Sequence, residues 1–254
     1  MLKMDYSEIQ PIIDLFPCLQ GEGMYVGVPH ILIRLSGCNL RCAFKGSLCD
    51  TTYSSWNPEK GKYSLQDVIN IIDKNPQIAN ILITGGEPTL HPVLLRGLIN
   101  IARKAKKKVT IETNGTIIKP DVLGKGHYPD LVSISPKLSS STPDGSFQQQ
   151  HESRRENIPA IVSWIRFAKQ HQLKYVVSTD DDIREVQDQV SRIALRMIDE
   201  GVSFPRLTVY LMPEGDTEAM LAEKRKWLAK KCIELGYFYT DRLHIIIFGT
   251  EREA

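Results

Sequence analysis

The stretch LSGCNLRCAFKGSLCDTTY, residues 35–53, contains three of the chain's five cysteines. Cys38, Cys42 and Cys49 are separated by three and by six residues. A structural zinc site takes four protein ligands, so three clustered thiols are one ligand short. His30 is a candidate fourth ligand, although it begins an apolar stretch and also fits a strand end or the core. The alternative is an iron–sulfur cube held by three thiolates, which leaves one iron open to another molecule.

The composition is that of a globular chain, with 254 residues, 42% of them hydrophobic, enough for one large α/β domain. The net charge of +2 is too small to favour nucleic-acid or membrane binding through bulk electrostatics. No N-terminal stretch resembles a signal peptide, and no apolar run approaches the length of a membrane span. We therefore expect a cytoplasmic location, where clustered cysteines serve as metal ligands or catalysts. Cys18 and Cys232 stand apart and are expected to be ordinary packed or surface thiols.

Apolar, β-branched runs alternate with segments of helical spacing. The expected strands are His30–Ser36, Asn80–Thr84, Lys108–Thr113, Asp130–Ser135, Lys174–Ser178, Leu207–Met212 and Leu243–Phe248. The expected helices are Ser64–Asp73, His91–Lys106, Ile158–His171, Asp182–Glu200 and Asp216–Leu235. Ser64 and Asp182 fit N-cap positions, and Gly201 and Gly236 fit positions just past helix ends. This alternation predicts an α/β fold, a parallel sheet covered by helices in a barrel or part-barrel, as a single domain over residues 1–254.

Two segments depart from the alternation. Residues 138–157 are polar, rich in serine and glutamine and prone to turns, which predicts a long insertion loop. A mobile surface insertion and a substrate lid are equally consistent with this composition. The basic cluster Arg103, Lys104, Lys106, Lys107 and Lys108 falls at the end of an expected helix. Cations are favoured there by the helix dipole, so we interpret the cluster as a solvated helix end rather than a nucleic-acid site.

Polar and glycine-containing motifs follow four of the expected strands. They are TGGEP (84–88), ETNGT (112–116), SISPK (133–137) and MPEG (212–215). The carboxyl ends of parallel strands meet at one edge of a sheet, which is where binding and catalytic groups gather. Any one motif fits plain turn chemistry, but four at the same edge, beside three thiols, indicate a shared site.

The cysteine loop after the first of these strands, followed by a GGE motif after the second, resembles the radical S-adenosylmethionine (SAM) superfamily. The usual spacing between the last two cysteines is two residues, so this chain carries about four extra, and Phe44 stands in for the usual aromatic residue. The resemblance narrows to the 7-carboxy-7-deazaguanine synthase family. The segments that carry it are LQGEG (19–23), GVPHILIRLSGCNLRC (27–42), CDT (49–51), ITGGEP (83–88), ETNGT (112–116), SISPK (133–137), LMPEG (211–215) and RLHIIIFG (242–249).

The alternatives are a glycyl-radical activating enzyme of the same superfamily, which shares the cysteine loop and GGE but lacks LQGEG and SISPK, and a zinc-stabilised binding protein without enzymatic activity.

The resemblance implies a role for each matched residue. Cys38, Cys42 and Cys49 are implied to hold a [4Fe–4S] cluster, with SAM on the fourth iron, and Thr51 to help hold Mg²⁺. The implied SAM-binding residues are Leu48, Asp50, Gly85, Gly86, Glu87, Ser135, Pro136, Lys137, Met212, Pro213 and Glu214. The implied substrate-binding residues are Leu19, Gln20, Gly21, Glu22, Arg34, Thr84 and Lys137.

Arg34 also stands out without the resemblance, because it interrupts the apolar run ILIRL. A buried, unpaired guanidinium is costly, so it is expected to meet an anion. We favour a bidentate contact to a substrate carboxylate over an internal salt bridge with Glu22 or Glu112.

The implied reaction converts 6-carboxy-5,6,7,8-tetrahydropterin to 7-carboxy-7-deazaguanine in 7-deazapurine (queuosine-type) biosynthesis. It proceeds by hydrogen abstraction, radical ring contraction and loss of ammonia, which makes the enzyme a carbon–nitrogen lyase. The radical itself is the expected catalyst, with no further catalytic residue. The implied partners are a reducing protein such as flavodoxin or ferredoxin and a second copy in a homodimer. The tail after Gly249 and the use of the product in tRNA or DNA are left unassigned.

Overall fold

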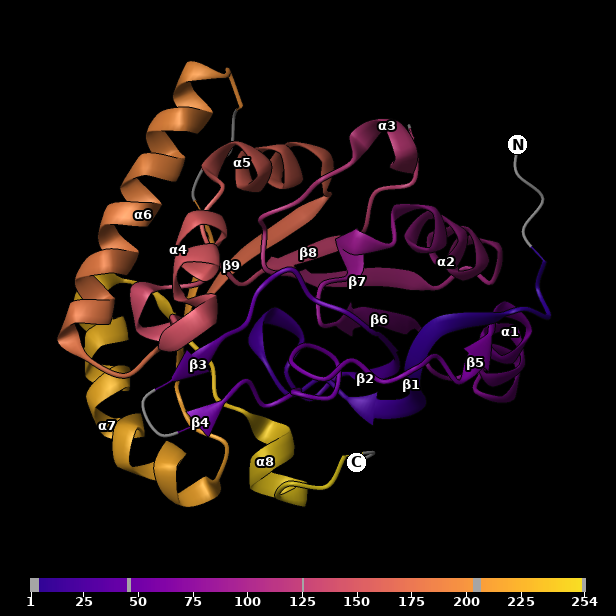
Figure 1. Cartoon of the computed structure of the whole chain (residues 1–254), viewed down its shortest axis with the longest axis horizontal. Helices are drawn as coiled ribbons and strands as arrows, with labels where there is room; N and C mark the ends of the chain where they lie inside the picture. Colours follow the sequence, from indigo (N-terminus) through magenta and orange to yellow (C-terminus); the bar gives the residue numbers. More distant parts are fainter. Residues whose placement is uncertain (1–4, 45–46, 125, 203–206, 253–254) are drawn as a thin grey trace.

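The protein is built around a large β-sheet, described by a computed structural model that covers residues 5–44, 47–124, 126–202 and 207–252. The strands are β1 (Ile9–Leu19), β2 (Pro29–Leu35), β3 (Ala43–Phe44), β4 (Ser47–Leu48), β5 (Tyr63–Ser64), β6 (Asn80–Gly85), β7 (Lys108–Thr113), β8 (Leu131–Ile134), β9 (Gln170–Val177), β10 (Val209–Pro213) and β11 (Phe238–Tyr239). Nine strands form one sheet in the order β11-β10-β9-β8-β7-β6-β2-β1-β5, and β3 pairs with β4 in a separate hairpin (Figure 1).

Most of the sheet is parallel. Every neighbouring pair from β2 to β11 runs parallel, whereas β1 and β5 are antiparallel additions at one edge. The first six expected strands are confirmed, as β2, β6, β7, β8, β9 and β10, with ends shifted by a few residues. The expectation of a parallel sheet covered by helices is therefore confirmed.

The expected strand over Leu243–Phe248 is wrong, because this run forms the short helix α8 (Leu243–Phe248). β11, the last strand on that side of the sheet, consists of only Phe238 and Tyr239 and so offers little backbone for a further strand to pair with. As a helix it buries Ile245 and leaves Ile246 and Ile247 exposed. Its first backbone N–H donates to the Gly21 carbonyl at 2.9 Å. Tertiary contacts thus override the strand propensity of the isoleucines.

Strand β1 was not expected, because Pro11 and Pro17 interrupt its sequence and proline is disfavoured within sheets. In the structure Pro11 lies at an irregularity in the pairing with β5. The pairing with β5 covers only Ile9–Ile12, so Pro17 lies where β1 has β2 on one side and no β5 partner on the other. The strand thereby tolerates both prolines.

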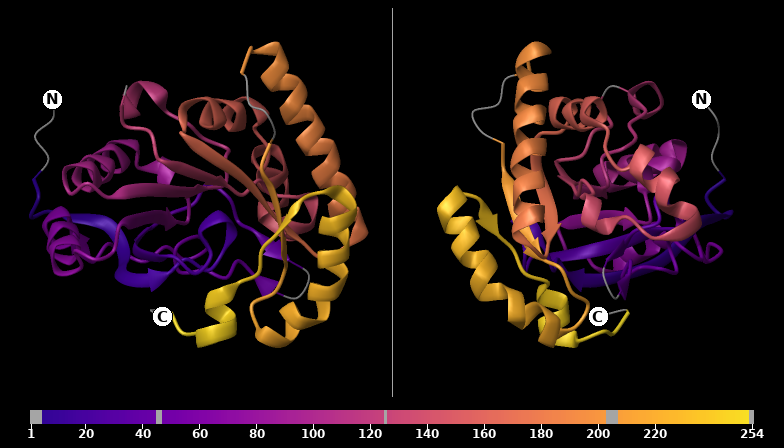
Figure 2. Two further views of the ribbon diagram at one scale, coloured as in Figure 1. Left: turned by 180° about the vertical axis from the view of Figure 1, so that it is seen from behind. Right: turned by 60° about the vertical axis from the view of Figure 1, so that its left-hand side comes forward.

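Helices cover the outside of the sheet. They are α1 (Leu65–Lys74), α2 (Pro92–Lys104), α3 (Pro120–Leu123), α4 (Gln148–Arg154), α5 (Ile158–Phe167), α6 (Asp180–Asp199), α7 (Glu218–Leu235) and α8. The two views of Figure 2 show the long helices α6 and α7 together along one side of the molecule, far from α1. Among the helices of the described residues, none has the length and apolar character needed to cross a membrane.

The helix ends largely follow the expected signals. Ser64 is the N-cap of α1, and Gly236 ends α7 in the left-handed conformation. Asp182 is not an N-cap, because Thr179 caps α6 and Asp182 completes the capping box from the third helical position. The expected helix Ile158–His171 is too long: α5 ends at Phe167, and β9 begins at Gln170.

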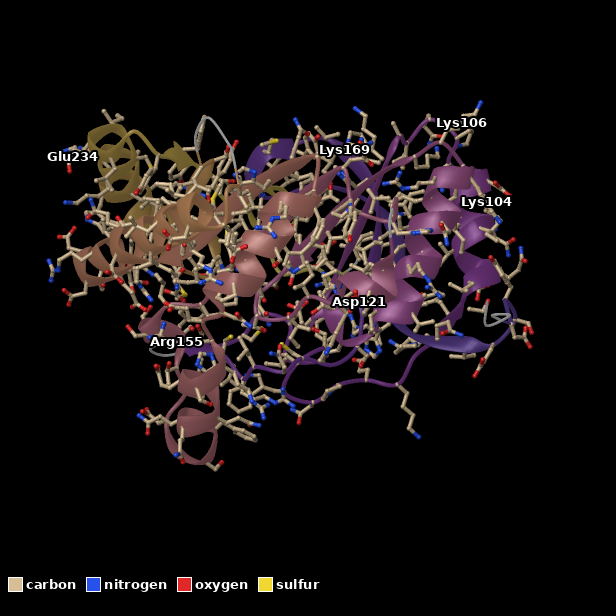
Figure 3. All side chains as sticks on the ribbon, turned by 90° about the horizontal axis from the view of Figure 1, so that it is seen from above. Lys104, Lys106, Asp121, Arg155, Lys169 and Glu234 are labelled. Atoms are coloured by element: carbon tan, nitrogen blue, oxygen red, sulfur yellow. The ribbon has the colours of Figure 1, made fainter. Side chains whose placement is uncertain are left out.

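The polar segment 138–157 is more ordered than the expected loop. It contains two short 3-10 helices, Ser139–Ser141 and Gly145–Phe147, followed by α4. Arg155, labelled in Figure 3, donates to the Lys137 carbonyl at 3.1 Å and to Glu185 at 2.7 Å. Phe147 packs edge-on against Trp56, with ring centroids 5.5 Å apart. The segment is thus attached both to α6 and to the loop that follows the cysteines.

The basic cluster at the end of α2 is partly used inside the fold. Lys104 and Lys106 lie at the outer surface in Figure 3. Lys107 Nζ instead donates to the carbonyl oxygens of Pro76 at 3.0 Å and Ile78, and Arg103 donates to the Tyr128 carbonyl. These contacts agree with the interpretation of the cluster as a helix end.

His171 makes the folded state sensitive to acid. It is buried in β9, and burial lowers its pKa from 6.5 to about 4. The unfolded chain therefore binds a proton below pH 6.5 that the folded chain does not, so stability is lost as pH falls from 6.5 towards 4. We expect His171→Gln to reduce this loss by about 1 kcal/mol per pH unit. Urea unfolding of both proteins at pH 5 and pH 7 measures the difference, and an unchanged pH dependence would contradict it.

Candidate active site

A cavity of about 630 Å³ lies at the carboxyl ends of the parallel strands. Its wall is formed by alternate residues of the strands, among them Leu32, Arg34, Leu82, Thr84, Glu112, Lys174 and Val176. The residues between them, such as Ile33, Ile83 and Ile111, are fully buried in the core beneath the helices. The two-residue period of a strand thus separates an apolar outer face from a largely polar inner face.

The three cysteines of the loop after β2 line the same cavity. The extra residues between Cys42 and Cys49 form the β3–β4 hairpin, in which Ala43 pairs with Leu48 and Phe44 with Ser47. The Cys49 N–H donates to the Cys42 carbonyl at 3.1 Å, which closes the hairpin at its base. The two cysteines are therefore adjacent in space despite their wide spacing. Ser47 and Leu48 form β4.

Shortening residues 43–48 to two residues that include an aromatic one is expected to preserve iron–sulfur binding. Cys42 and Cys49 are joined by a backbone hydrogen bond at the base of the hairpin, so we expect a shorter connection to leave both thiols in place. The check is the iron and sulfide content after anaerobic reconstitution. A shortened protein that folds but retains no iron would show that the hairpin itself positions Cys49.

The thiol arrangement suits a cluster better than one metal ion. Within the described part of the chain, no three His, Cys, Asp or Glu side chains converge closely enough to hold a single ion. The three thiolates of an iron–sulfur cube bind three different irons and so stand farther apart than the ligands of one zinc. The Leu40 N–H lies 3.4 Å from the Cys38 sulfur, as a donor to a cluster ligand would. His30 does not line the cavity and is not a fourth ligand.

Burial disfavours the ionisation of two of the thiols, those of Cys38 and Cys42. It raises the pKa of Cys38 to about 12, with a further contribution from Glu87. It also raises the pKa of Cys42 to about 11, against the opposing effect of Lys137. Both thiols are therefore protonated at neutral pH until a metal displaces the protons.

The GGE loop packs directly on the cysteine loop. Gly85 and Gly86 both line the cavity. A Cβ atom on Gly86 would lie 2.1 Å from the Gly37 carbonyl oxygen and 2.5 Å from that of Ser54, so only glycine fits. The Glu87 N–H donates to the same Gly37 carbonyl at 2.7 Å. The ends of β2 and β6 are thus locked together beside the thiols.

Glu87, expected to bind the cofactor, is not among the residues that line the cavity. Its fully buried carboxylate accepts hydrogen bonds from the Thr89 N–H and hydroxyl, the Thr113 hydroxyl and the Asn114 N–H, at 2.7–3.0 Å. Asn114 in turn donates to Asn39 of the cysteine loop at 2.9 Å. Glu87 therefore connects the loops that follow β6 and β7, and through Asn114 it also connects them to the cysteine loop after β2. Pro136 is likewise absent from the wall, whereas Ser135 and Lys137 line it.

The other expected site residues line the cavity. On the substrate side they are Leu19, Gln20, Gly21, Glu22, Arg34, Thr84 and Lys137. On the cofactor side they are Leu48, Asp50, Gly85, Gly86, Ser135, Met212, Pro213 and Glu214, with Thr51 beside the cysteines. Glu214 accepts hydrogen bonds from Lys224 at 2.6 Å and Ser178 at 3.2 Å, and more distantly from Ser47 at 3.4 Å. It thereby joins the end of β10 to the hairpin.

Arg34 pairs with Asp14, and neither Glu22 nor Glu112 is its partner. The two residues face each other across the β1–β2 pairing, and Arg34 Nε donates to Asp14 Oδ2 at 2.8 Å. Asp14 could not be identified from the sequence, because β1 itself was not expected. The bond uses Nε, so the two terminal nitrogens of a side chain that lines the cavity remain available to a ligand.

Two buried cations that were not among the expected site residues, Lys174 and Arg242, complete the polar wall. Lys174 pairs with Glu22, and Arg242 pairs with Glu22 at 3.1 Å and with Asp50. Burial would raise the pKa of Glu22, but Lys174 and Arg242 together hold it well below its usual value. The position of Lys174 inside the run LKYVV, like that of Arg34 in ILIRL, was the available sequence signal.

Glu112 provides the acceptors at the centre of this wall. Its two oxygens accept from Gln20 Nε2 at 3.2 Å and from the Thr84 hydroxyl at 3.0 Å, and Lys174 lies 3.8 Å away. The cavity is thus lined by cations and carboxylates together with the three thiols of the cysteine loop, and a fourth thiol, Cys18 of β1, also lines it.

Comparisons with known proteins agree on the family. The family model of the radical SAM superfamily matches residues 32–188. The chain is 36% identical over 245 residues to a 7-carboxy-7-deazaguanine synthase of Rhodopirellula baltica, covering 95% of this chain and 87% of the relative. It is 36% identical to a protein of the same name from Halobacterium salinarum, covering 96% and 92%. Its fold resembles the crystal structure of QueE from Escherichia coli, with a TM-score of 0.59 at 23% identity, over 92% of this chain and 94% of the other.

Proposed function

The chain belongs to the 7-carboxy-7-deazaguanine synthase family of radical SAM enzymes, and from this premise we propose that it converts 6-carboxy-5,6,7,8-tetrahydropterin to 7-carboxy-7-deazaguanine. The observation that carries the proposal is the shared cavity, which joins three thiols to a wall of polar side chains. A zinc-stabilised binding protein has no need of such a wall beside its metal ligands.

The thiols and the neighbouring strand ends form the cofactor side. Cys38, Cys42 and Cys49 would hold a [4Fe–4S] cluster, which with SAM supplies a 5′-deoxyadenosyl radical able to remove a hydrogen atom from the pterin ring. Backbone groups of Gly85 and Gly86 and the side chains of Ser135 and Lys137, all of which line the cavity, would bind SAM. The rest of the SAM contacts we assign to Leu48, Asp50, Met212, Pro213 and Glu214.

Other side chains of the cavity wall would bind and orient the pterin. Arg34 offers paired N–H donors for the substrate carboxylate. Gln20 and Glu112 offer an amide and acceptors to the ring, and Leu19, Gly21, Glu22 and Thr84 complete this wall. Leu32, Leu82 and Val176 provide apolar surface that excludes water from the reacting carbon. The chain's task is to fix the ring hydrogen in reach of the radical.

Further features belong to the same proposal. A Mg²⁺ ion would bind near Thr51, through its hydroxyl, water and substrate oxygens. The electron donor would be a flavodoxin- or ferredoxin-like protein. We also propose one radical SAM domain over residues 1–254, a homodimer and a cytoplasmic location.

Product formation tests the proposal. Anaerobically reconstituted protein is incubated with 6-carboxytetrahydropterin, SAM, Mg²⁺ and dithionite, and the mixture is analysed by mass spectrometry. We expect 7-carboxy-7-deazaguanine from this substrate and none from a tetrahydropterin that lacks the carboxylate. Cleavage of SAM without any deazaguanine would contradict the substrate and favour another radical SAM activity, such as glycyl-radical activation. Colourless protein that retains zinc after reconstitution with iron and sulfide would contradict the radical chemistry itself.

A further inference from the structure

Asp14 is a fully buried carboxylate held between two arginines. Its Oδ2 accepts from Arg34 Nε at 2.8 Å and from the Tyr53 hydroxyl at 3.3 Å. Its Oδ1 accepts from Arg252 Nε at 3.1 Å and Nη2 at 2.9 Å. Each arginine therefore uses a different oxygen of the same carboxylate.

Arg252 is bound at three places although it lies in the C-terminal segment after α8. Besides Asp14, it pairs with both oxygens of Glu59 at 2.9 and 3.0 Å. Its guanidinium carbon lies 3.7 Å from the centroid of the Tyr53 ring. Such a bidentate, stacked geometry suits arginine and cannot be reproduced by lysine.

The segment that carries Arg252 belongs to the cavity. Gly249, Thr250, Glu251 and Arg252 all line it, as do Arg34 and Tyr53. Figure 1 shows α8 and the C-terminal segment below β1 and β2.

The hydrogen bonds from Arg252 to Asp14 Oδ1 prevent Arg34 from forming a bidentate pair with Asp14. A carboxylate with both oxygens free attracts a neighbouring guanidinium into a bidentate pair. In that pair Arg34 would commit a terminal nitrogen to Asp14. Because Arg252 fills Oδ1, Arg34 is restricted to its Nε bond, and both terminal nitrogens stay available.

We propose that Arg252 is a positioning residue that, by sharing Asp14, keeps the terminal nitrogens of Arg34 directed to the carboxylate of the pterin. This inference rests on the proposed function for the identity of the ligand. It explains why a cation of the C-terminal segment reaches a fully buried carboxylate on β1.

Calorimetry on the reconstituted protein tests the inference without turnover. The probes are 6-carboxypterin and pterin that lacks the carboxylate. Arg252→Gln is expected to weaken 6-carboxypterin binding by about 10-fold or more, as expected for one lost hydrogen bond to a charged group, and to leave pterin binding within about 3-fold. Arg252→Lys should bind 6-carboxypterin more tightly than Arg252→Gln does but more weakly than the wild type. The double variant Asp14→Asn/Arg252→Gln should recover part of the affinity, because a neutral amide no longer captures Arg34.

Lys62→Gln is the matched control, since Lys62 pairs with Glu59 at 2.8 Å but does not contact Asp14. It should bind both probes as the wild type does. Equal weakening of both probes by Arg252→Gln would show a general closure of the cavity and overturn the inference, as would unchanged binding of 6-carboxypterin. Wild-type protein that binds 6-carboxypterin selectively yet forms no product would contradict the proposed function while the inference stands.

Discussion

Cys42→Ala is expected to give a folded protein that retains no iron–sulfur cluster and forms no 7-carboxy-7-deazaguanine above the uncatalysed background. Cys42 is buried in the cavity wall at the base of the hairpin. Its loop then retains only Cys38 and Cys49, and the further thiol that lines the cavity, Cys18, belongs to β1. Two remaining thiolates cannot hold a cluster that also leaves an iron open. Iron content, the absorbance near 400 nm and product mass measure the loss.

Cys232→Ala is the control for the removal of a thiol. Cys232 is buried on α7 and contacts the Phe238 carbonyl, away from the cavity wall. The Cys232→Ala protein should retain both the iron–sulfur cluster and the formation of product. A Cys42→Ala protein with full iron content and normal product formation would remove Cys42 from the ligand set.

Arg242→Met is expected to destabilise the protein by about 3 kcal/mol, because it removes a buried guanidinium and deprives the Glu22 carboxylate, whose side chain is 13% exposed, of one of its two cations. Arg242 is 8% exposed and joins Glu22, Asp50 and the Gly215 carbonyl, so it connects the end of β1, the cysteine loop and the end of β10. Asp50 directly follows Cys49, and we therefore also expect weaker retention of iron. Urea unfolding and iron content after desalting measure the two effects.

The matched control is Arg192→Met, which removes an ion pair with Glu156 and Asp188 from a side chain 41% exposed. Exposed pairs contribute little, so its cost should be about 1 kcal/mol or less. Equal destabilisation by the two substitutions would contradict the structural role given to Arg242.

The sequence was sufficient to predict the parallel sheet and the edge of the sheet at which the cavity lies. Runs such as ILIRL and NILIT are buried on one face by helices, and glycines follow the strands where the cavity lies. These features depend on neighbouring residues, which is why local patterns could predict them.

The errors concern features that depend on distant partners. Leu243–Phe248 has the composition of a strand, yet it forms α8, which begins with a hydrogen bond to the distant Gly21 carbonyl. The link from Arg34 through Asp14 to Arg252 joins residues that lie far apart in the sequence, so no local pattern could indicate it.

The central claim is that the thiols of the cysteine loop and the polar wall belong to one active site. In it SAM would bind the iron that carries no cysteine ligand, and the pterin would bind beside SAM. Electron paramagnetic resonance of the reduced, reconstituted protein tests this most directly, with spectra recorded alone, after addition of SAM, and after further addition of 6-carboxytetrahydropterin. We predict a reduced [4Fe–4S] signal that changes with SAM and changes again with the pterin. A cluster signal that is the same in all three samples would contradict the account.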